Sequence, residues 1–527
     1  MSEGGTAAVS SSPAEDADAR PWRPGRVPGL VAGSIALAVY VATASRYVSC
    51  DDIAEFQTLA ATGGIAHAGY PVPVMLFQLM GHLPVSTIAF RANLVTALAG
   101  ALAVGLSACA AVRLGVRPVA AVVAAIALAL GVTVWEMSTH AEVYAITMAI
   151  AAATFIAAQR FGERPGAGRA ALLGLLGGLA VLTHFIVLGL VLPVAAVTVR
   201  AVRAGRLRVG HVAVGIVGLL IGLAPFGYML AHDRPDAPMN YIHDTLRSDN
   251  VREPAGDDPP VTRLERAVWL LSARQYLGGY AFAPFTDLRL RSVHLITDLT
   301  LNEFPLWGLP LAAMGLWRLR RRPAWLIDLA LWMAGTLFFM GVGAPLLALR
   351  VFFLPGLWIL SLGIALGLDG LGRRSRVLFA AAATLLVLTP LLRMRVAEPP
   401  GPIGRYGVLS FAWAFAPAGW NPFAADRSWD VYGRGVMRAL PPRALVLSCW
   451  QEATTLRYFR YAEPLRNDVD VLYHCRVPRP AFAAADAAGR PIFTTYPLTL
   501  EMTGGRPFTQ VARWPRGGLW RIAGPVR

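Results

Sequence analysis

Long apolar segments recur along most of the chain, from residue 28 to residue 394. Segments of this length and hydropathy are typical of helices that cross a lipid bilayer. Hydrophobic residues make up 55% of the 527 residues and charged residues only 15%, which is too little charge for a soluble enzyme of this size. We therefore expect a mainly α-helical, polytopic membrane protein with about eleven spans. They lie near residues 28–46, 90–112, 118–134, 143–159, 170–183, 185–199, 211–230, 303–317, 324–342, 351–368 and 377–394.

The positions of the arginines predict how these spans are oriented. The net charge is +16, but the basic residues flank the spans, so we expect no nucleic-acid partner. If the N-terminus is cytoplasmic and every span crosses, nineteen flanking arginines fall on the inner side and five on the outer side. This asymmetry follows the positive-inside rule. It predicts a multi-pass protein of the cytoplasmic (inner) membrane. The five outer arginines are Arg46, Arg91, Arg350, Arg393 and Arg395.

This topology divides the chain into three parts. Residues 1–27 begin with a stretch rich in Ser, Ala, Gly and Asp, which predicts a disordered cytoplasmic tail. Residues 28–396 form the transmembrane domain, with outer loops at 47–89 and 231–302. Its first helix is expected to serve as an uncleaved anchor. Residues 397–527 are too polar to span the membrane and are expected to form a domain outside it.

The C-terminal part has the pattern of a small α/β domain. "RALVLSC" (443–449) and "DVDVLYH" (468–474) read as buried strands, and "EATTLRYFRYAE" (452–463) between them reads as a helix. These form a β-α-β unit, and "RPIFTTYP" (490–497) is a further strand. Cys449 and Cys475 end the first two strands, so they could form a disulfide in an outer compartment. Two unpaired buried cysteines fit the pattern equally well.

Three carboxylates follow the first span within five residues: Asp51, Asp52 and Glu55. On a helix Glu55 shares a face with either aspartate. Close carboxylates raise one another's pKa unless a cation or metal lies between them, which suits a general base or a divalent-metal site. The alternative is structural, because acidic residues in a first turn favour the helix dipole. If a metal is bound, these three are its candidate ligands, but the sequence does not require any cofactor.

The next stretch, "GGIAHAGYP" (63–71), demands an irregular backbone beside the membrane, which is tolerated where protein or a wet cavity receives it. It contains His67, a turn residue or part of a site. Further on, Glu142 lies at the outer end of a span, where ionisable groups are usually functional. Arg350 is a lone cation at the outer start of another span. It could bind a phosphate with two hydrogen bonds or extend to lipid headgroups.

In the long outer loop, residues 262–280 mix apolar residues and arginines at helical spacing. They predict an amphipathic helix, which either lies on the outer leaflet or packs on the protein.

With these residues identified, the chain resembles a family of multi-pass proteins related to the protein O-mannosyltransferases that modify immunoglobulin-like domains of plexins and receptor tyrosine kinases. That family belongs to the GT-C membrane glycosyltransferases. Asp52-Ile-Ala-Glu55 keeps the first and last residues of the family's Asp-Ser-Gly-Glu. His67-Ala-Gly-Tyr-Pro71 is one residue shorter than its His-Pro-Pro-Gly-Tyr-Pro.

Supporting matches cover most of the chain. They are Ala141-Glu142-Val143-Tyr144, Leu182-Thr183-His184, Gln275-Tyr276, Arg350-Val-Phe-Phe-Leu-Pro355 and the tail stretch 453–472.

The resemblance implies a GT-C fold and an inverting enzyme. Such an enzyme would move a hexosyl or mannosyl group from a polyprenyl-phosphate donor to a hydroxyl on a protein, glycan or lipid at the outer face. Asp52 and Glu55 would be the catalytic carboxylates, with Asp52 as the base. The residues implied to bind donor or substrate are His67, Tyr70, Glu142, Tyr144, His184, Gln275, Tyr276 and Arg350.

Two other classes of function stay open at this point. A transporter would place its charged residues near mid-membrane and show repeated halves, whereas these acids gather at one face. A membrane protein that binds sugar or lipid without catalysis is the third possibility.

Overall fold

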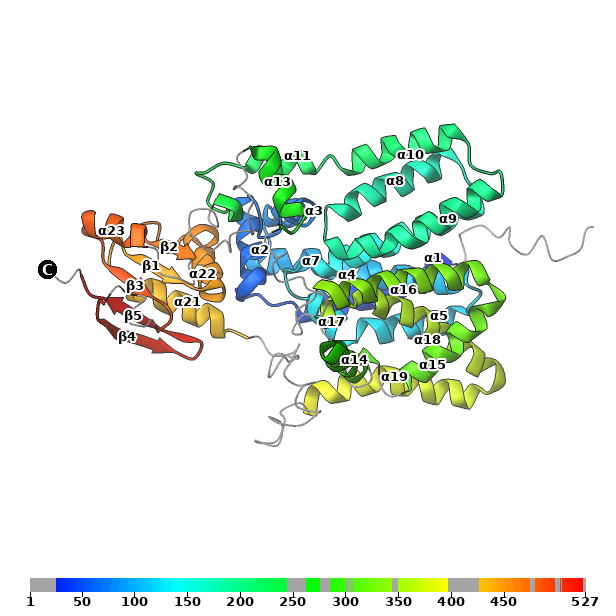
Figure 1. Cartoon of the computed structure of the whole chain (residues 1–527). Helices are drawn as coiled ribbons and strands as arrows, with labels where there is room; N and C mark the ends of the chain where they lie inside the picture. The colour runs from blue at the N-terminus through cyan, green and yellow to red at the C-terminus, as the bar shows by residue number, and fades with distance from the viewer. Residues whose placement is uncertain are drawn as a thin grey trace, which may run out of the picture.

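The computed structural model describes residues 25–243, 262–274, 285–299, 303–304, 307–343, 349–396, 426–473, 479–497, 503 and 505–524. They form a bundle of helices and a small α/β domain that lies at one end of the bundle (Figure 1). The predicted fold class, mainly helical with a small C-terminal sheet, is therefore confirmed.

The bundle begins with α1 (Arg26–Thr43) and two helices of residues 47–89, α2 (Asp51–Thr62) and α3 (Pro71–Gly81). Residues 47–89 and 231–302 keep their predicted names, the first and the long outer loop. Its next helices are α4 (Ile88–Arg113), α5 (Pro118–Ala129), α6 (Val132–Met137), α7 (Val143–Glu163), α8 (Ala167–Val181), η3 (Phe185–Leu190), α9 (Val191–Arg203), α10 (Val209–Gly222) and α11 (Phe226–His232). After it come α13 (Arg263–Leu271), α14 (Phe285–Asp298), α15 (Gly308–Arg318), η6 (Leu319–Arg321), α16 (Pro323–Gly343), α17 (Leu349–Phe352), α18 (Leu354–Arg374) and α19 (Arg376–Val396).

Seven helical stretches of the described residues are long and apolar enough to cross a membrane. Each coincides with a predicted span. They are Arg26–Thr43, Ile88–Arg113, Val143–Glu163, Phe185–Arg203, Val209–His232, Pro323–Met340 and Leu354–Arg374. The protein is therefore a multi-pass membrane protein.

The predicted count of eleven spans is not confirmed. Three of the other four predicted spans are shorter apolar helices: α5, α8 and the first part of α19. The fourth, near 303–317, holds α15, which has only 11 residues. The prediction for 118–134 differs because the chain leaves the helix at Leu130–Gly131 and restarts as α6.

The core of the bundle is built around α18, of which 89% of the spanning window is buried. Small residues let its neighbours approach closely. A Cβ added to Gly315 of α15 would lie 1.8 Å from the carbonyl oxygen of Gly363 in α18. The Trp358 indole donates to the carbonyl of Ala103 in α4 at 3.1 Å. The helices around α18 are therefore closely packed.

The arginine-rich turns lie at the end of the bundle away from the α/β domain. In Figure 1 the turns from α9 to α10 and from α18 to α19 are both there. The charges are partly neutralised, because Asp369 of α18 bonds Arg117 and Arg373 at 2.7 Å each.

The α/β domain has a five-stranded sheet in the order β2-β1-β3-β5-β4. Strands β1 (Leu445–Ser448), β2 (Asp470–Tyr473) and β3 (Ile492–Thr494) are parallel, and β4 (Phe508–Trp514) and β5 (Gly517–Ile522) form an antiparallel hairpin. Its other elements are α21 (Ser428–Ala439), α22 (Trp450–Arg457), the π-helix η9 (Tyr458–Ala462) and α23 (Arg479–Ala487). The predicted β-α-β unit is β1-α22-β2. Cys475 lies outside the described residues, so the disulfide with Cys449 stays a prediction.

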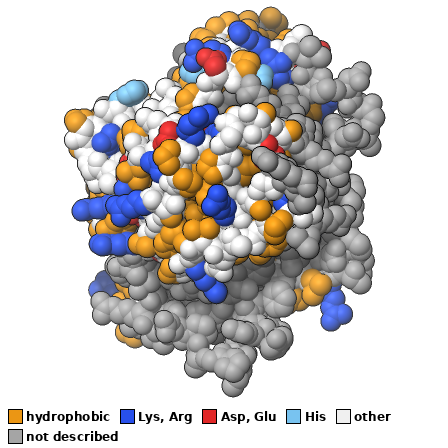
Figure 2. Space-filling model, turned by 90° about the vertical axis from the view of Figure 1, so that its left-hand side faces the viewer, with side chains coloured by type: hydrophobic (Ala, Val, Ile, Leu, Met, Phe, Trp, Pro, Cys, Tyr) orange, Lys and Arg blue, Asp and Glu red, His pale blue; other side chains and the backbone are white. Residues whose placement is uncertain are grey.

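The α/β domain and the first outer loop share one hydrophobic core. Val48, Ala54 and Ala89 of the bundle pack in a single buried cluster with Leu456 and Phe459 of the domain. Figure 2 views the molecule from this end. Its basic side chains are scattered among apolar and uncharged ones over the described part of the face, rather than gathered into one stripe.

Candidate active site

The carboxylates of the first outer loop lie at the start of α2, where the bundle meets the α/β domain. Asp51 opens the helix with a left-handed backbone (φ 58°) after an extended Cys50. The Asp52 side chain is 36% exposed, whereas that of Glu55 is 1% exposed. Asp52 is therefore the carboxylate that an incoming molecule can reach, and Glu55 is enclosed.

The glycine-rich stretch folds back over α2 and pairs with the long outer loop. The Ile65 N–H donates to the Met239 carbonyl, and the Tyr241 N–H donates to the Ile65 carbonyl, both at 3.0 Å. Gly64 has φ 121°, and a Cβ there would lie 2.0 Å from the Met239 oxygen. Only glycine allows this approach without strain. The pairing fixes the turn that presents His67.

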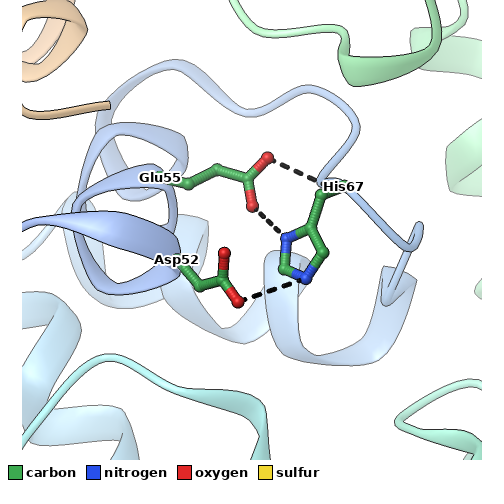
Figure 3. Close-up of side chains that lie close together, drawn as sticks. All are labelled: Asp52, Glu55 and His67. Atoms are coloured by element: carbon green, nitrogen blue, oxygen red, sulfur yellow. Dashed lines mark hydrogen bonds and ion pairs between the residues drawn. The ribbon is translucent and has the colours of Figure 1, made fainter. Parts of the chain in front are cut away.

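His67 bridges the two carboxylates (Figure 3). Its Nδ1 lies 2.6 Å from Glu55 Oε2 and its Nε2 lies 3.4 Å from Asp52 Oδ2, while its backbone N–H donates to Glu55 Oε1 at 3.0 Å. Burial alone would lower the pKa of His67, but the Asp52 and Glu55 carboxylates raise it to about 10. The ring is therefore an imidazolium at neutral pH, and both of its N–H groups can face a carboxylate.

The same three side chains could hold a divalent cation. One ligand atom from each of Asp52, Glu55 and His67 lies within 4.8 Å of the others. Two carboxylates and an imidazole suit a first-row transition metal. The ion would displace a proton from His67. The set differs from the one predicted, because Asp51 turns away and its Oδ2 accepts from Gln451 Nε2 at 3.2 Å.

The α/β domain contributes to this site, which the sequence did not indicate. Trp450 Nε1 donates to Asp52 Oδ1 at 2.7 Å, across 398 residues of chain. Its ring packs edge-on against Tyr241 at 5.6 Å and His67 at 5.9 Å between ring centroids. Trp450 and Tyr241 lie in no motif that singles them out. The one nearby signal was the tail resemblance, which begins three residues after Trp450.

Ion pairs of Asp233 hold the loop that carries Tyr241 in place. The buried Asp233 accepts from Arg266 Nε at 2.7 Å and lies 2.8 Å from His243 Nε2. Arg266 belongs to α13, whose Trp269 and Leu270 are buried against the protein. The predicted amphipathic helix therefore packs on the protein over 263–271. Gln275 and Tyr276 lie outside the described residues.

An aromatic wall, made of Tyr70, Tyr144, His184 and Phe352, lies beside His67. Tyr70 stacks on His184 at 5.6 Å, and Tyr144 lies 5.2 Å from the same ring. Phe352 of α17 contacts His184 at 5.4 Å. The structure thus brings three of the predicted site residues, Tyr70, Tyr144 and His184, into one cluster beside His67.

Glu142 lies at the start of α7, two residues before Tyr144. Burial raises its pKa, and the Asp52 charge raises it further, whereas the His67 charge lowers it. Glu142 therefore belongs electrostatically to the same site as Asp52 and His67.

Arg350 forms an ion pair inside the protein. Its Nη2 lies 2.7 Å from Glu136 Oε2, and the two side chains are 12% and 9% exposed. Glu136 is on the short helix α6, and Arg350 is on α17 with Phe352. The arginine is thus paired beside the aromatic wall.

Comparison with known proteins places this site in a family context. Residues 52–206 match the family model described as the protein O-mannosyl-transferase TMEM260 N-terminal domain. The resemblance to that family is confirmed. The match starts at Asp52 and spans the predicted site residues from Asp52 to His184, while Asp51 lies one residue before it.

A curated relative agrees over the same region. The mouse protein O-mannosyl-transferase TMEM260 is 33% identical over 155 residues, which are 29% of this chain and 22% of the mouse protein. The similarity thus spans about a fifth of that relative's length.

Solved structures extend the similarity to the whole fold. Crystal structures of ArnT from Cupriavidus metallidurans, bound to undecaprenyl phosphate and in the apo state, superpose with TM-scores of 0.57 and 0.54. They share 15% and 16% sequence identity with this chain, and cover 93% of it and 97% of ArnT. The chain therefore has the GT-C fold of ArnT, as the sequence predicted.

Proposed function

We propose that this protein is a membrane glycosyltransferase that moves a sugar from a polyprenyl-phosphate donor to a hydroxyl acceptor at the outer face. The observation that carries the proposal is the cluster of Asp52, Glu55 and His67 where the helical bundle meets the α/β domain. It lies in a fold shared with a protein crystallised with undecaprenyl phosphate. The match of residues 52–206 to an O-mannosyl-transferase domain supports the same reaction class.

Asp52 is the general base in this proposal, because it is the exposed carboxylate of the cluster. It takes the proton of the acceptor hydroxyl as the oxygen attacks the anomeric carbon of the donor sugar. The bond from that carbon to the phosphate oxygen breaks, and the polyprenyl phosphate leaves with the bonding electrons. Attack opposite the leaving group inverts the anomeric carbon.

Glu55 acts through His67. The buried carboxylate holds the imidazolium by two contacts, from the ring and from the backbone. The other ring nitrogen then faces Asp52, so Glu55 sets where the base points. If a divalent cation is bound, Asp52, Glu55 and His67 would hold it, and it would supply a fixed positive charge in place of the His67 imidazolium.

Arg350 is the candidate for the leaving phosphate. A guanidinium can bind a phosphate with two parallel hydrogen bonds. Its present partner, Glu136, would give way when the phosphate arrives. Ring contacts connect the two places: Phe352, two residues after Arg350, contacts His184, and His184 contacts Tyr70 and Tyr144.

The experiment uses purified protein with undecaprenyl phosphate carrying a labelled mannose, or another labelled hexose. We expect release of undecaprenyl phosphate and transfer of label to an acceptor in a membrane extract. Reconstituted vesicles serve as the control for transport. Movement of labelled sugar across vesicles without release of undecaprenyl phosphate would indicate a transporter, and binding without turnover would refute catalysis.

A further inference from the structure

Both oxygens of the Asp52 carboxylate are engaged, one by each domain. Oδ1 accepts from the Trp450 indole at 2.7 Å, and Oδ2 faces the His67 ring at 3.4 Å. A carboxylate contacted on both oxygens has a defined plane. The Trp450 N–H is a neutral donor, so it orients the carboxylate without placing a full positive charge against it.

Trp450 is itself held in place. It is the first residue of α22, and its ring packs against Tyr473 at 5.0 Å and Tyr241 at 5.6 Å between centroids. Tyr473 ends strand β2 of the same domain, whereas Tyr241 belongs to the outer loop of the bundle. The indole is thus fixed from both domains.

The docking of α22 on α2 is what brings Trp450 to Asp52. The Thr455 hydroxyl of α22 donates to the Ser49 carbonyl at 3.0 Å. Beside it, Ala54 of α2 lies in the buried cluster with Leu456 and Phe459. This packing leaves little freedom for the start of α22 to move away from the carboxylate.

We propose that Trp450 is a positioning residue for Asp52, and that sugar transfer therefore depends on docking of the C-terminal domain onto α2. The inference rests on the proposed function, in which Asp52 is the base. Fixed orientation of a reacting group is a large contribution to catalysis, and small misplacements are costly.

The first test is the variant Trp450→Phe, which keeps an aromatic ring and removes the N–H. Single-turnover transfer at saturating labelled donor should fall by roughly tenfold or more, the loss of one hydrogen bond to a charged group. Affinity for undecaprenyl phosphate should stay within about twofold. The matched control is Trp514→Phe, because Trp514 lies in the same domain and packs on Tyr432. Equal rates for the two variants would overturn the inference.

A double variant separates positioning from general damage to the fold. If Trp450 acts through Asp52, adding Trp450→Phe to Asp52→Asn should not lower the residual rate further. A loss of the same size in both backgrounds would mean that Trp450 acts only on the fold, and would overturn the inference.

A second measurement does not need activity. In protein labelled with ¹⁵N-tryptophan, the Trp450 indole signal should shift and exchange its proton faster in Asp52→Ala, which removes the acceptor oxygen, and change little in Asp51→Ala. No response to Asp52→Ala would overturn the inference even if wild-type protein transfers sugar. Wild-type protein that turns over no donor would instead refute the proposed function itself, and the role of Trp450 with it.

Discussion

Asp51 and Asp52 are neighbours in the sequence, but their side chains face different partners. Successive residues of a helix point about 100° apart. Asp52 faces His67 and Trp450, while Asp51 faces Gln451. We expect Asp52→Asn to lower the single-turnover transfer rate at least about a hundredfold, because an amide cannot accept the acceptor's proton. Asp51→Asn should be mild, and donor binding should change little in either variant.

Glu55→Gln should also be severe, since it removes the charge that holds the His67 imidazolium. The three variants together test whether Asp52 is the base. An inactive Asp51→Asn beside an active Asp52→Asn would make Asp51 the base. Normal transfer by all three variants would mean that these acidic residues only stabilise the start of α2. Glu142 would then be the next candidate for the general base.

The pair between Arg350 and Glu136 gives a second prediction. Arg350→Ala should weaken binding of undecaprenyl phosphate by roughly 1.5–3 kcal/mol, the range for hydrogen bonds to charged groups. Arg350→Lys should restore part of the affinity, because a lysine cannot form the two parallel bonds. Glu136→Gln should increase affinity by about threefold or more, because it removes a competing carboxylate.

The readout is equilibrium binding of undecaprenyl phosphate, with undecaprenol, which lacks the phosphate, as the control. The variants should bind undecaprenol as the wild type does. Unchanged phosphate affinity in all three variants would mean that the pair with Glu136 only holds α6 against α17.

The individual residues that could be predicted from the sequence are those in short local motifs. Asp52, Glu55 and His67 lie within sixteen residues of one another, so one motif contains the whole cluster. Trp450 could not be predicted in the same way, because its contact with Asp52 closes a loop of 398 residues. The pairing of Arg350 with Glu136 was missed for the same reason.

At the scale of elements, the glycine-rich stretch pairs with the long outer loop through its backbone. This pairing predicts that adding one methyl group at Gly64 lowers the stability of the protein. Gly64→Ala should strain a left-handed backbone and push against the Met239 carbonyl, at a cost of about 1–3 kcal/mol. The thermal midpoint and the transfer rate should both fall. Gly168→Ala is the control, because no atom lies within 4 Å of the added Cβ. Equal stability of the two variants would argue against the described pairing.

Helices and strands with a clear hydrophobic pattern in their sequence were predicted better than those without one. The long apolar helices and the β1-α22-β2 unit follow directly from their patterns. The division of 118–134 into α5 and α6 was not predicted, because the residues on both sides of Gly131 are equally apolar. The helix α14 and the β4–β5 hairpin were also not predicted. Their sequences are mixed, and packing against the rest of the protein decides their structure.

At the scale of the whole molecule, the arginine asymmetry predicts where the two ends of the chain lie. We expect the N-terminus in the cytoplasm and the C-terminal domain outside. A periplasm-dependent reporter such as alkaline phosphatase, fused after Arg527, should be active, and the same reporter placed after Arg206 should be inactive. The opposite pair of results would reverse the predicted orientation and put the acidic cluster on the inner side.

The fold of the whole chain could be predicted because hydropathy and a single motif block agreed. The motifs around Asp52 and His67 indicated a family, and that family has the GT-C fold, which composition alone does not specify. The choice of sugar and acceptor depends instead on the side chains around Asp52. Those side chains, Trp450 and Tyr241 among them, come from distant segments of the chain, and no single segment shows that they meet.

The distance along the chain between Asp52 and Trp450 also sets an order of events during synthesis. Protein is made at about 5–20 residues per second, so Trp450 emerges roughly 20–80 s after Asp52. During that interval the carboxylate lacks its indole partner, although α2 and His67 have already been made. A nascent chain whose C-terminal α/β domain has not yet been made would thus transfer sugar from donor lipids slowly.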